Sequence, residues 1–368
     1  MTVQSPDVIV AGAGIVGLSA ACELAKRGAR CIVFDRGRSG REASHAAGGI
    51  LSPQAETLPD SPLLPLALRA RDRHVRLAEE LLSLTGMSVE HQRAGVLTLS
   101  FSAEQTQALR ALTTAQRELG LRAEMVRRED LTRVEPAAHP DAVGAALFVD
   151  DHRVDNRRLM LALKTLALSR GVEIREHCPL RAIEVVNGGL VAVRTDDVRI
   201  EVRSLINALG AWAGQIEGDS DAPPVRPVKG HMMALSDGPS MRHVVYGHPG
   251  YIVPRGDGRL IVGSTMEEVG FDTRVTVEGI ARLIRIATAI APDAKQATIV
   301  ETWVGLRPAT PDGLPVIGRG SVAGVIVAGG LFRNGILLGP LVGEIAAGLA
   351  LGDEPSADLS AFRPGRFT

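Results

Sequence analysis

The first apolar run of the chain extends from Val8 to Ala25 and changes its period on the way. It opens with β-branched residues that are typical of a buried strand and continues with apolar residues at helical spacing. No Lys or Arg precedes the run, and Glu23 and Lys26 mark its end, which is unlike a signal peptide. We therefore expect a strand, a turn and a helix.

Later segments repeat this mixture of strand and helix patterns. The spacing of apolar residues predicts a helix from about 156 to 170 and short strands near 172–176, 181–186, 190–194 and 204–208. The apolar stretch Gly335–Leu351 is short for a membrane span and contains Pro340 and Glu344. We expect a buried helix there, with Pro340 in its first turn. The whole pattern indicates an α/β sheet with a smaller strand layer.

Composition narrows the classes of function. The chain has 368 residues, enough for a nucleotide-binding domain and a substrate domain. A formal net charge of −1 gives no broad attraction for nucleic acid or anionic lipid, so a small molecule is the expected partner. The three cysteines, Cys22, Cys31 and Cys178, match neither a metal pattern nor a disulfide framework. We expect a cytoplasmic protein without a metal site.

The turn after the first expected strand reads Gly12-x-Gly14-x-x-Gly17. Gly12 allows the tight turn, Gly14 lets a pyrophosphate approach the backbone, and Gly17 lets the helix pack on its strand. The phosphates would then face the positive end of the helix. A second strand ends in Asp35, placed to accept a hydrogen bond from a ribose hydroxyl and unsuited to a 2′-phosphate. This pattern indicates a dinucleotide site, in which FAD and NAD both remain open.

A run of small residues, 41–56, follows the second strand and is too polar and flexible for a core strand. Such a segment can lie flat against a planar ligand. Here the sequence resembles the D-amino acid oxidase family of flavoenzymes, and within it the glycine oxidases of thiamine synthesis. The resemblance implies that this loop passes along the isoalloxazine ring of FAD, with Ser44, Gly48, Gly49 and Ile50 at the matching places.

Three further segments carry the same resemblance. Residues 151–159 are similar to the family's Asp-x-x-Val-Asp-Pro-x-x-Leu segment before a helix. Residues 171–180 resemble the strand and bend whose last residue, here Leu180, lies against the adenosine half of FAD. Residues 204–213 match the family's second glycine-containing motif, with Gly210. The matches follow one another along the chain in the family's order.

The resemblance also implies a fold and its domains. The fold class is α/β, with a glutathione-reductase-like FAD-binding Rossmann domain and a second, smaller α+β substrate domain that contains an antiparallel sheet. The FAD-binding domain would be discontinuous and consist of residues 1–80, 145–215 and 300–368. Residues 81–144 and 216–299 would form the substrate domain.

The residues expected to bind FAD come from the glycine turn, the second strand, the small-residue loop and the start of the last helix. They are Gly12, Gly14, Ile15, Val16, Gly17, Asp35, Arg36, Ala43, Ser44, Gly48, Gly49, Ile50, Leu180, Gly210, Leu331, Phe332, Arg333, Asn334, Gly335, Ile336 and Leu337. The positive end of the last helix would point at the N1 and C2 carbonyl edge of the flavin.

The segment Gly305–Gly318 contains the strongest candidate for substrate binding. Pro308 restrains Arg307 to an extended backbone. An Arg in an apolar setting needs an anionic partner, and its planar fork suits a carboxylate with two parallel bonds. An internal pair with Asp or Glu is one alternative, whereas the resemblance assigns Arg307 to the carboxylate of the substrate.

Three other residues are expected around the substrate because of the resemblance. Tyr251 matches a tyrosine that donates to the same carboxylate, and Met266 matches an apolar pocket position. Arg333 belongs to the family's last flavin-contacting segment. For Tyr251 and Met266, ordinary packing in a sheet or a core is the alternative.

These residues imply oxidative deamination of glycine or another small amino acid. Hydride would pass from the substrate Cα to flavin N5 and give an imine and, with oxygen as acceptor, hydrogen peroxide. The alternatives are a sarcosine oxidase and a D-amino acid or cyclic imino acid dehydrogenase of the same family, with a non-catalytic flavin-binding assembly factor as a remote one. A nicotinamide-dependent reductase is disfavoured because the chain has no second GxGxxG fingerprint. A homo-oligomer is possible.

His45 is a departure from the glycine oxidases, which usually have a small or apolar residue there. In related dimethylglycine and sarcosine dehydrogenases, a His in a similar setting is bonded covalently to the flavin. An ordinary hydrogen-bonded His beside the cofactor requires no such chemistry, so we expect noncovalent FAD. Cys178 lies well before the Gly-x-Arg-Pro motif at 305–308. This position does not match the cysteinyl attachment of FAD in monomeric sarcosine oxidases.

Overall fold

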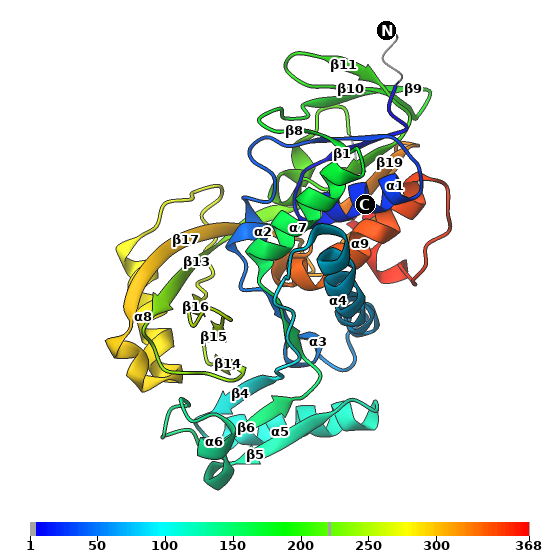
Figure 1. Cartoon of the computed structure of the whole chain (residues 1–368). Helices are drawn as coiled ribbons and strands as arrows, with labels where there is room; N and C mark the ends of the chain where they lie inside the picture. Colours follow the sequence, from blue (N-terminus) through cyan, green and yellow to red (C-terminus); the bar gives the residue numbers. More distant parts are fainter. Residues whose placement is uncertain (1–4, 220–221, 368) are drawn as a thin grey trace.

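Two large β-sheets organise the chain, of which the computed structural model describes residues 5–219 and 222–367 (Figure 1). The first sheet has six strands, in the spatial order β18 (Val316–Arg319), β19 (Val325–Gly329), β12 (Leu205–Asn207), β1 (Val8–Ala11), β2 (Cys31–Phe34) and β8 (Glu173–Arg175). All neighbours in it are parallel except β18 and β19. The carboxyl ends of β1, β2 and β12 therefore lie at one edge of the sheet, where ligands of open α/β sheets bind.

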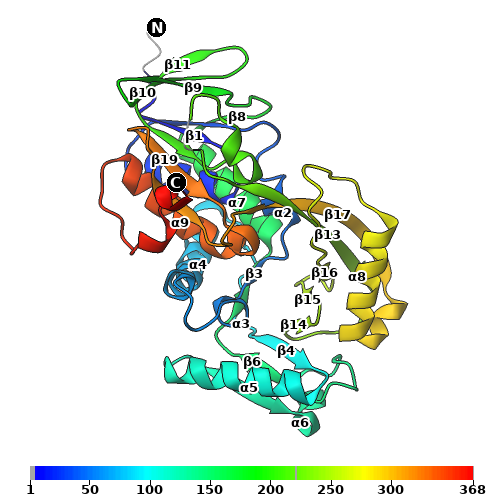
Figure 2. The ribbon, with the colours of Figure 1, turned by 180° about the vertical axis from the view of Figure 1, so that it is seen from behind.

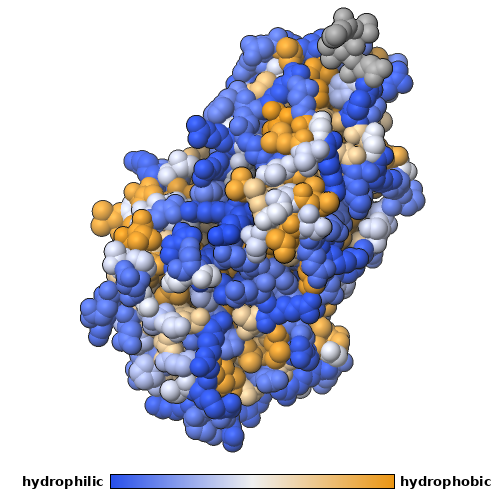
Figure 3. All heavy atoms as spheres, viewed as in Figure 1, coloured by the Kyte–Doolittle hydropathy of each residue, from blue (hydrophilic) through white to orange (hydrophobic). Residues whose placement is uncertain are grey.

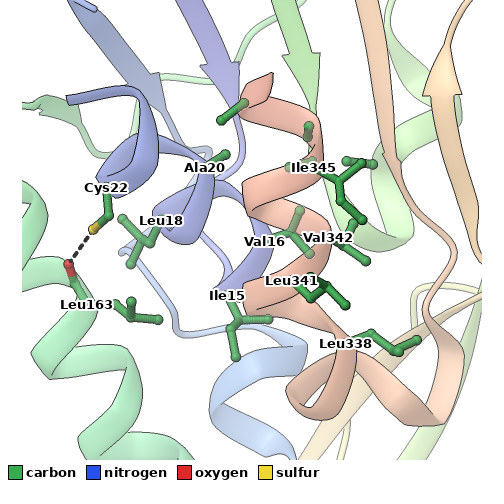
Figure 4. Packing of buried hydrophobic residues seen from close by; sticks show 14 of the residues in the cluster. Ile15, Val16, Leu18, Ala20, Cys22, Leu163, Leu338, Leu341, Val342 and Ile345 are labelled. Carbon is green, nitrogen blue, oxygen red and sulfur yellow. Dashed lines mark hydrogen bonds between the residues drawn. The ribbon is translucent and has the colours of Figure 1, made fainter. Parts of the chain in front are cut away.

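Four long helices pack beside this sheet. They are α1 (Ile15–Lys26), α4 (Leu63–Thr85), α7 (Asn156–Ser169) and α9 (Gly335–Ala350). Figure 4 shows how α1 and α9 approach each other. A Cβ atom at Gly339 would lie 2.5 Å from Ile15 Cγ2, and one at Gly343 would lie 2.6 Å from Ser19 Cβ. The two helices can pack this closely only because α9 has glycine at both positions.

The second sheet has eight strands and a mostly antiparallel order. Its strands are β17 (Thr298–Ala309), β13 (Arg226–Ser236), β16 (Leu260–Gly263), β15 (Gly250–Pro254), β14 (Val244–Gly247), β4 (Val96–Ser100), β6 (Gly144–Phe148) and β5 (Ala123–Arg127). β13 and β17 are the longest strands, and they extend from the region of the first sheet out to α8 (Val277–Ile290) (Figure 2). Helices α5 (Ala103–Glu118) and α6 (Arg128–Val134) lie with β4, β5 and β6.

The remaining elements are short. They comprise α2 (Ala43–Ala46), α3 (Pro53–Glu56), the pair β3 (Ile50–Leu51) and β7 (His152–Arg153), the small sheet of β9 (Ala182–Val186), β10 (Gly189–Arg194) and β11 (Arg199–Glu201), and the 3₁₀ turns η1 (Gly210–Gln215), η2 (Pro292–Gln296), η3 (Phe332–Asn334), η4 (Ser360–Phe362) and η5 (Pro364–Phe367).

The elements expected from the apolar pattern are present. The first apolar run forms β1, a turn and α1, and the four short strands correspond to β8, β9, β10 and β12. The helix expected near residue 156 is α7. It begins there because the Asp155 carboxylate accepts hydrogen bonds from the backbone N–H groups of Arg157 at 2.9 Å and Arg158 at 3.0 Å.

The last helix differs from the expectation in one respect. Pro340 does not lie in the first turn of α9 but inside the helix, which begins at Gly335. A proline there cannot donate to the carbonyl of Ile336. His74 of α4 donates to that carbonyl instead, with Nε2 2.8 Å from Ile336 O and 3.1 Å from Leu337 O. The interior proline is tolerated because a buried side chain replaces the missing donor.

Helix α9 also contains the one acidic residue of this apolar stretch, Glu344. Glu344 forms an ion pair with Arg73 of α4, so its charge has a partner inside the fold. None of the helices in the described part of the chain is long and apolar enough to cross a membrane. Polar residues cover most of the face in Figure 3, with small hydrophobic groups between them.

The division into two domains remains a proposal. β6 and β17 fall mostly within ranges that the sequence assigns to the FAD-binding domain, but both pair with strands of the eight-stranded sheet. We therefore place β6 and most of β17 on the substrate side of the division. The chain crosses between the two sheets several times, so a site between them is built from both.

Candidate active site

A cavity opens at the carboxyl edge of the six-stranded sheet. Its walls come from the β1–α1 turn, the end of β2, the loop through α2, the segment after β12, the end of β17 and the start of α9. Such an edge, where a parallel sheet meets the N-terminus of a helix, favours a dinucleotide.

Each of the three glycines in the β1–α1 turn is required for a different structural reason. Gly12 has a φ of +100°, and a Cβ atom there would lie 2.4 Å from the carbonyl oxygen of Ala208. A Cβ atom at Gly17 would lie 1.8 Å from the carbonyl oxygen of Gly12, so only glycine lets α1 come this close to its strand. Gly14 lines the cavity, and a Cβ atom there would have Ser44 Oγ as its nearest neighbour, at 3.4 Å. Phosphate can approach the backbone there.

Asp35 is fixed at the carboxyl end of β2. Its Oδ2 accepts a hydrogen bond from Ala13 N at 2.7 Å and its Oδ1 accepts one from Gly37 N at 2.8 Å. The side chain lines the cavity, so its remaining lone pairs can accept hydrogen bonds from ribose hydroxyls. Beside it, the Arg36 guanidinium lies 4.3 Å from the centre of the Trp212 ring, which holds two more cavity residues in place.

The loop from α2 to β3 is held against the cavity by side chains that the sequence pattern does not reveal. Asn156 Nδ2 donates to the carbonyl of Ser44 at 2.9 Å, and Arg255 Nη2 donates to the carbonyl of Gly48 at 3.0 Å. Asn156 and Arg255 are also bonded to each other at 2.9 Å. Ser44 Oγ in turn accepts from the N–H of Ile15 at 3.0 Å, which fixes the loop to the start of α1.

His45 does not line the cavity, although its neighbours in the loop do. Its ring lies within 3.5 Å of Arg41 Nη1, and its backbone carbonyl accepts from Asn156. Burial, and then the charges of Arg157 and Arg41, lower the pKa of His45 to about 4. The imidazole is therefore neutral at pH 7, and it contacts Arg41 rather than the cavity.

Arg307 lies on β17 opposite β13, with space provided by a glycine on the neighbouring strand. A Cβ atom at Gly230 would lie 2.1 Å from Arg307 Nη1. Nη2 donates to Ser264 Oγ at 2.6 Å, and Nη1 donates to the carbonyl of Thr265 at 3.2 Å. Burial lowers the pKa of the guanidinium. Within residues 5–219 and 222–367, no Asp or Glu forms an ion pair with Arg307, so the internal pair is not found.

Tyr251 of β15 is placed beside Arg307 at the same cavity. Cβ atoms at Gly48 and Gly263 would lie 3.1 Å and 2.6 Å from its ring, so the two glycines make room for it. Its hydroxyl oxygen interacts with the Arg307 guanidinium, and its O–H group donates to the thioether of Met232 at 3.7 Å. A thioether is a weak acceptor, which leaves the hydroxyl available to donate to a carboxylate.

A second cavity shares Tyr251, Ser264, Arg307 and Arg333 with the first. Its outer wall consists of residues from β4, α5 and the segment around Pro249. Met266 also lines it, and is 57% exposed. The shared residues mark the place where a substrate can reach the dinucleotide cavity.

Arg333 is paired with an acidic residue that sequence reasoning missed. Its Nη2 lies 3.0 Å from Glu56 Oε1, and the hydroxyl of Tyr246 donates to the same oxygen. The charge of Glu56 raises the pKa of Arg333 well above its usual range. Burial, and then the charge of Glu56, raise the pKa of Tyr246. Glu56 and Tyr246 lie in ordinary polar and strand positions far apart in the sequence, so no motif signals them.

Three expected FAD residues do not line the cavity: Gly17, Leu180 and Leu337. Gly17 serves the packing of α1, and Leu180 and Leu337 are buried in hydrophobic clusters with exposures of 7% and 1%. All other residues expected around FAD line the first cavity. Their contacts with FAD stay a prediction.

Comparison with known proteins identifies the class. Residues 7–349 match the family model of the FAD dependent oxidoreductases, DAO, and the chain belongs to this family. FAD is the cofactor of the family, and the turn at Gly14, the carboxylate of Asp35 and the start of α9 fit it. The expected fold class is confirmed, as is the resemblance to the D-amino acid oxidase family.

Several relatives lie close to the chain over nearly its full length. Glycine oxidase from Geobacillus kaustophilus is 34% identical over 97% of this chain and 96% of its own length. The crystal structure of glycine oxidase from Geobacillus kaustophilus superimposes with a TM-score of 0.94, at 33% identity and with 99% of both chains covered. The bifunctional protein ThiO/ThiG of Synechocystis sp. is 36% identical over 98% of this chain, which spans only 54% of that relative.

Proposed function

We propose that this chain is an FAD-dependent oxidase of glycine or another small amino acid. The observation that carries the proposal is Arg307, a guanidinium with no carboxylate partner among the described residues, which lines the same cavity as the expected FAD residues. Relatives named glycine oxidase support the same substrate class. The reaction would convert the amino acid to its imine and, with oxygen as electron acceptor, form hydrogen peroxide.

The residues of the chain bind and orient the substrate. Arg307 holds the carboxylate through its planar fork, and Tyr251 donates a hydrogen bond to the same group. With the carboxylate fixed, the substrate Cα is held in one orientation within the cavity. FAD, when bound, supplies the hydride acceptor. The start of α9 places backbone N–H groups and the positive end of a helix at the cavity wall.

A role in thiamine synthesis belongs to the same proposal. Relatives with the name ThiO/ThiG support it, although the chain spans about half the length of those bifunctional proteins. We also propose a cytoplasmic location, in keeping with the free thiols of Cys22, Cys31 and Cys178. A homo-oligomer remains a possible assembly of the enzyme.

The experiment that tests the proposal is a substrate panel with oxygen uptake. Glycine, sarcosine, D-alanine and D-proline are supplied to the FAD-loaded protein, and the rates of oxygen consumption and peroxide formation are measured together. Glycine should give the highest kcat/KM. A preference for sarcosine or D-proline would move the enzyme to the alternatives within the family, and flavin reduction without oxygen uptake would indicate a dehydrogenase.

A further inference from the structure

Glu56 has one carboxylate oxygen in use and one free. Oε1 accepts hydrogen bonds from the Tyr246 hydroxyl and from Arg333 Nη2. Oε2 accepts no hydrogen bond from any residue that the structure describes, and it is not among the fully buried atoms that lack a partner. Because Glu56 lines the cavity, a ligand there can reach this oxygen. The side chain is 12% exposed and lines the same cavity as Arg307 and Tyr251. The charge of Glu56 also acts on the Arg307 guanidinium, so this acceptor is held near the expected carboxylate site.

The position of Glu56 is built by the fold. It is the last residue of α3, a short helix whose first N–H groups are bonded to the fully buried Asp151, with Ala55 N 2.9 Å from Oδ2. Ser52 Oγ donates to the same oxygen at 2.6 Å. Gln54, also buried, exchanges hydrogen bonds with Gln116 of α5. A backbone anchored in this way keeps the carboxylate in one place.

The charges at the site are complementary to an amino acid. Arg333 already has Glu56 as its counter-ion, whereas Arg307 has no such partner among the described residues. The carboxylate of an incoming amino acid is thus attracted to Arg307. Its amino group carries N–H donors, and Oε2 of Glu56 is an acceptor with no other donor. The two ends of a small zwitterion match these two groups.

We propose that Glu56 Oε2 accepts a hydrogen bond from the amino group of the substrate and so selects amines over simple carboxylates. The proposal rests on the proposed function, because it takes the amino acid to be bound at Arg307. Glu56 then has two tasks, since Oε1 neutralises Arg333 and Oε2 binds the amine. A role limited to neutralising Arg333 is the competing explanation.

Two ligands that differ only in the amino group on Cα separate these explanations without turnover. α-Aminoisobutyrate has an amino group but no Cα–H bond to oxidise, and isobutyrate lacks the amino group. Their dissociation constants are measured from the change in flavin absorbance for the wild type, for Glu56→Gln, and for Tyr246→Phe as the control that keeps the carboxylate. We expect the wild type and Tyr246→Phe to bind α-aminoisobutyrate about tenfold or more tightly than isobutyrate, as for a charged hydrogen bond.

Glu56→Gln should lose this preference, and it should bind isobutyrate as well as the wild type does or better, because Arg333 regains an unpaired charge. Equal weakening of both ligands would show that Glu56 only shapes the site and would overturn the proposal. If Glu56→Gln fails to load FAD, the wild type decides alone: no preference for the amino ligand rejects the proposal. Failure of the proposed function is distinct, because it appears as no oxygen uptake with the wild type and glycine.

Discussion

The space that Arg307 occupies exists because residue 230 has no side chain. On the neighbouring strand β13, Gly230 pairs directly with Gly305, two residues before Arg307. Ser264 and Thr265 then fix the guanidinium through a hydroxyl and a carbonyl, neither of which cancels its charge. At the scale of single residues, the carboxylate site is therefore a cation whose position is set by neutral groups.

Removing or displacing Arg307 should have the same effect. We expect Arg307→Ala to lose about 2–5 kcal/mol of substrate binding, as for a broken buried charge pair. Gly230→Ala should weaken substrate binding in the same direction, because its Cβ atom would lie 2.1 Å from Nη1. Apparent dissociation constants for glycine, from anaerobic flavin reduction, measure both effects.

Gly189→Ala serves as the matched control, since a Cβ atom there would have its nearest neighbour at 3.7 Å. This variant should behave as the wild type. An FAD-loaded Gly230→Ala or Arg307→Ala protein with unchanged glycine binding would remove Arg307 from the site.

His45 should carry no covalent flavin. Its side chain does not line the cavity, and its neighbours there are Arg41 and Arg157. After acid precipitation, we expect the yellow colour in the supernatant and an intact-protein mass without an FAD adduct. Colour that stays in the pellet for the wild type and is lost in His45→Ala would contradict this expectation.

Local motifs revealed some of these residues and not others. Arg307 stands beside a proline in a glycine-rich segment, and Asp35 ends a strand at a fixed distance from Gly17, so short-range pattern was enough. Glu56 meets Tyr246 across 190 positions of sequence. Such a contact depends on how β14 is placed beside α3, which no local pattern contains.

At the scale of elements, α9 is the most informative. It packs on α1 through Gly339 and Gly343 and begins at the cavity wall. Pro340 interrupts its hydrogen bonds one turn after this start, and His74 repairs the interruption from α4. The sequence predicted the helix but not the position of its proline, because the donor that makes Pro340 acceptable comes from a distant helix.

His74 should stabilise the protein through the carbonyl of Ile336. His74→Ala leaves this buried carbonyl without a donor and should cost about 1–3 kcal/mol of stability. In a Pro340→Ala background, residue 340 regains an N–H group, so the same His74→Ala change should cost less. Urea unfolding of the four proteins forms a double-mutant cycle. An equal cost in both backgrounds would show that His74 does not act through this carbonyl.

His74 also predicts how stability depends on pH. Burial lowers the pKa of His74 from 6.5 to about 4, so the unfolded chain takes up a proton at a higher pH than the folded chain. Its contribution is complete above pH 6.5 and is lost as the pH falls toward 4. The free energy of unfolding should fall over this window, and less steeply in His74→Gln. Equal slopes for the two proteins would reject this assignment.

At the scale of the whole molecule, the site lies where the two sheets meet. The six-stranded sheet and its helices provide the dinucleotide edge, and the eight-stranded sheet provides Tyr251 and Arg307. The sequence predicted four strands of the first sheet, β1, β2, β8 and β12, from local patterns, whereas it gave no prediction for β18 and β19. It assigned β6 and β17 to the FAD-binding domain, whereas both strands pair within the eight-stranded sheet, a pairing that no local pattern contains.

The central claim is that the cavity brings FAD and a small amino acid together. Anaerobic addition of glycine to the purified yellow protein tests it directly, with the visible absorbance of the flavin as the signal. We expect the absorbance to bleach with glycine and to return when oxygen is admitted. Absorbance that stays unchanged with glycine, sarcosine, D-alanine and D-proline alike would contradict the claim.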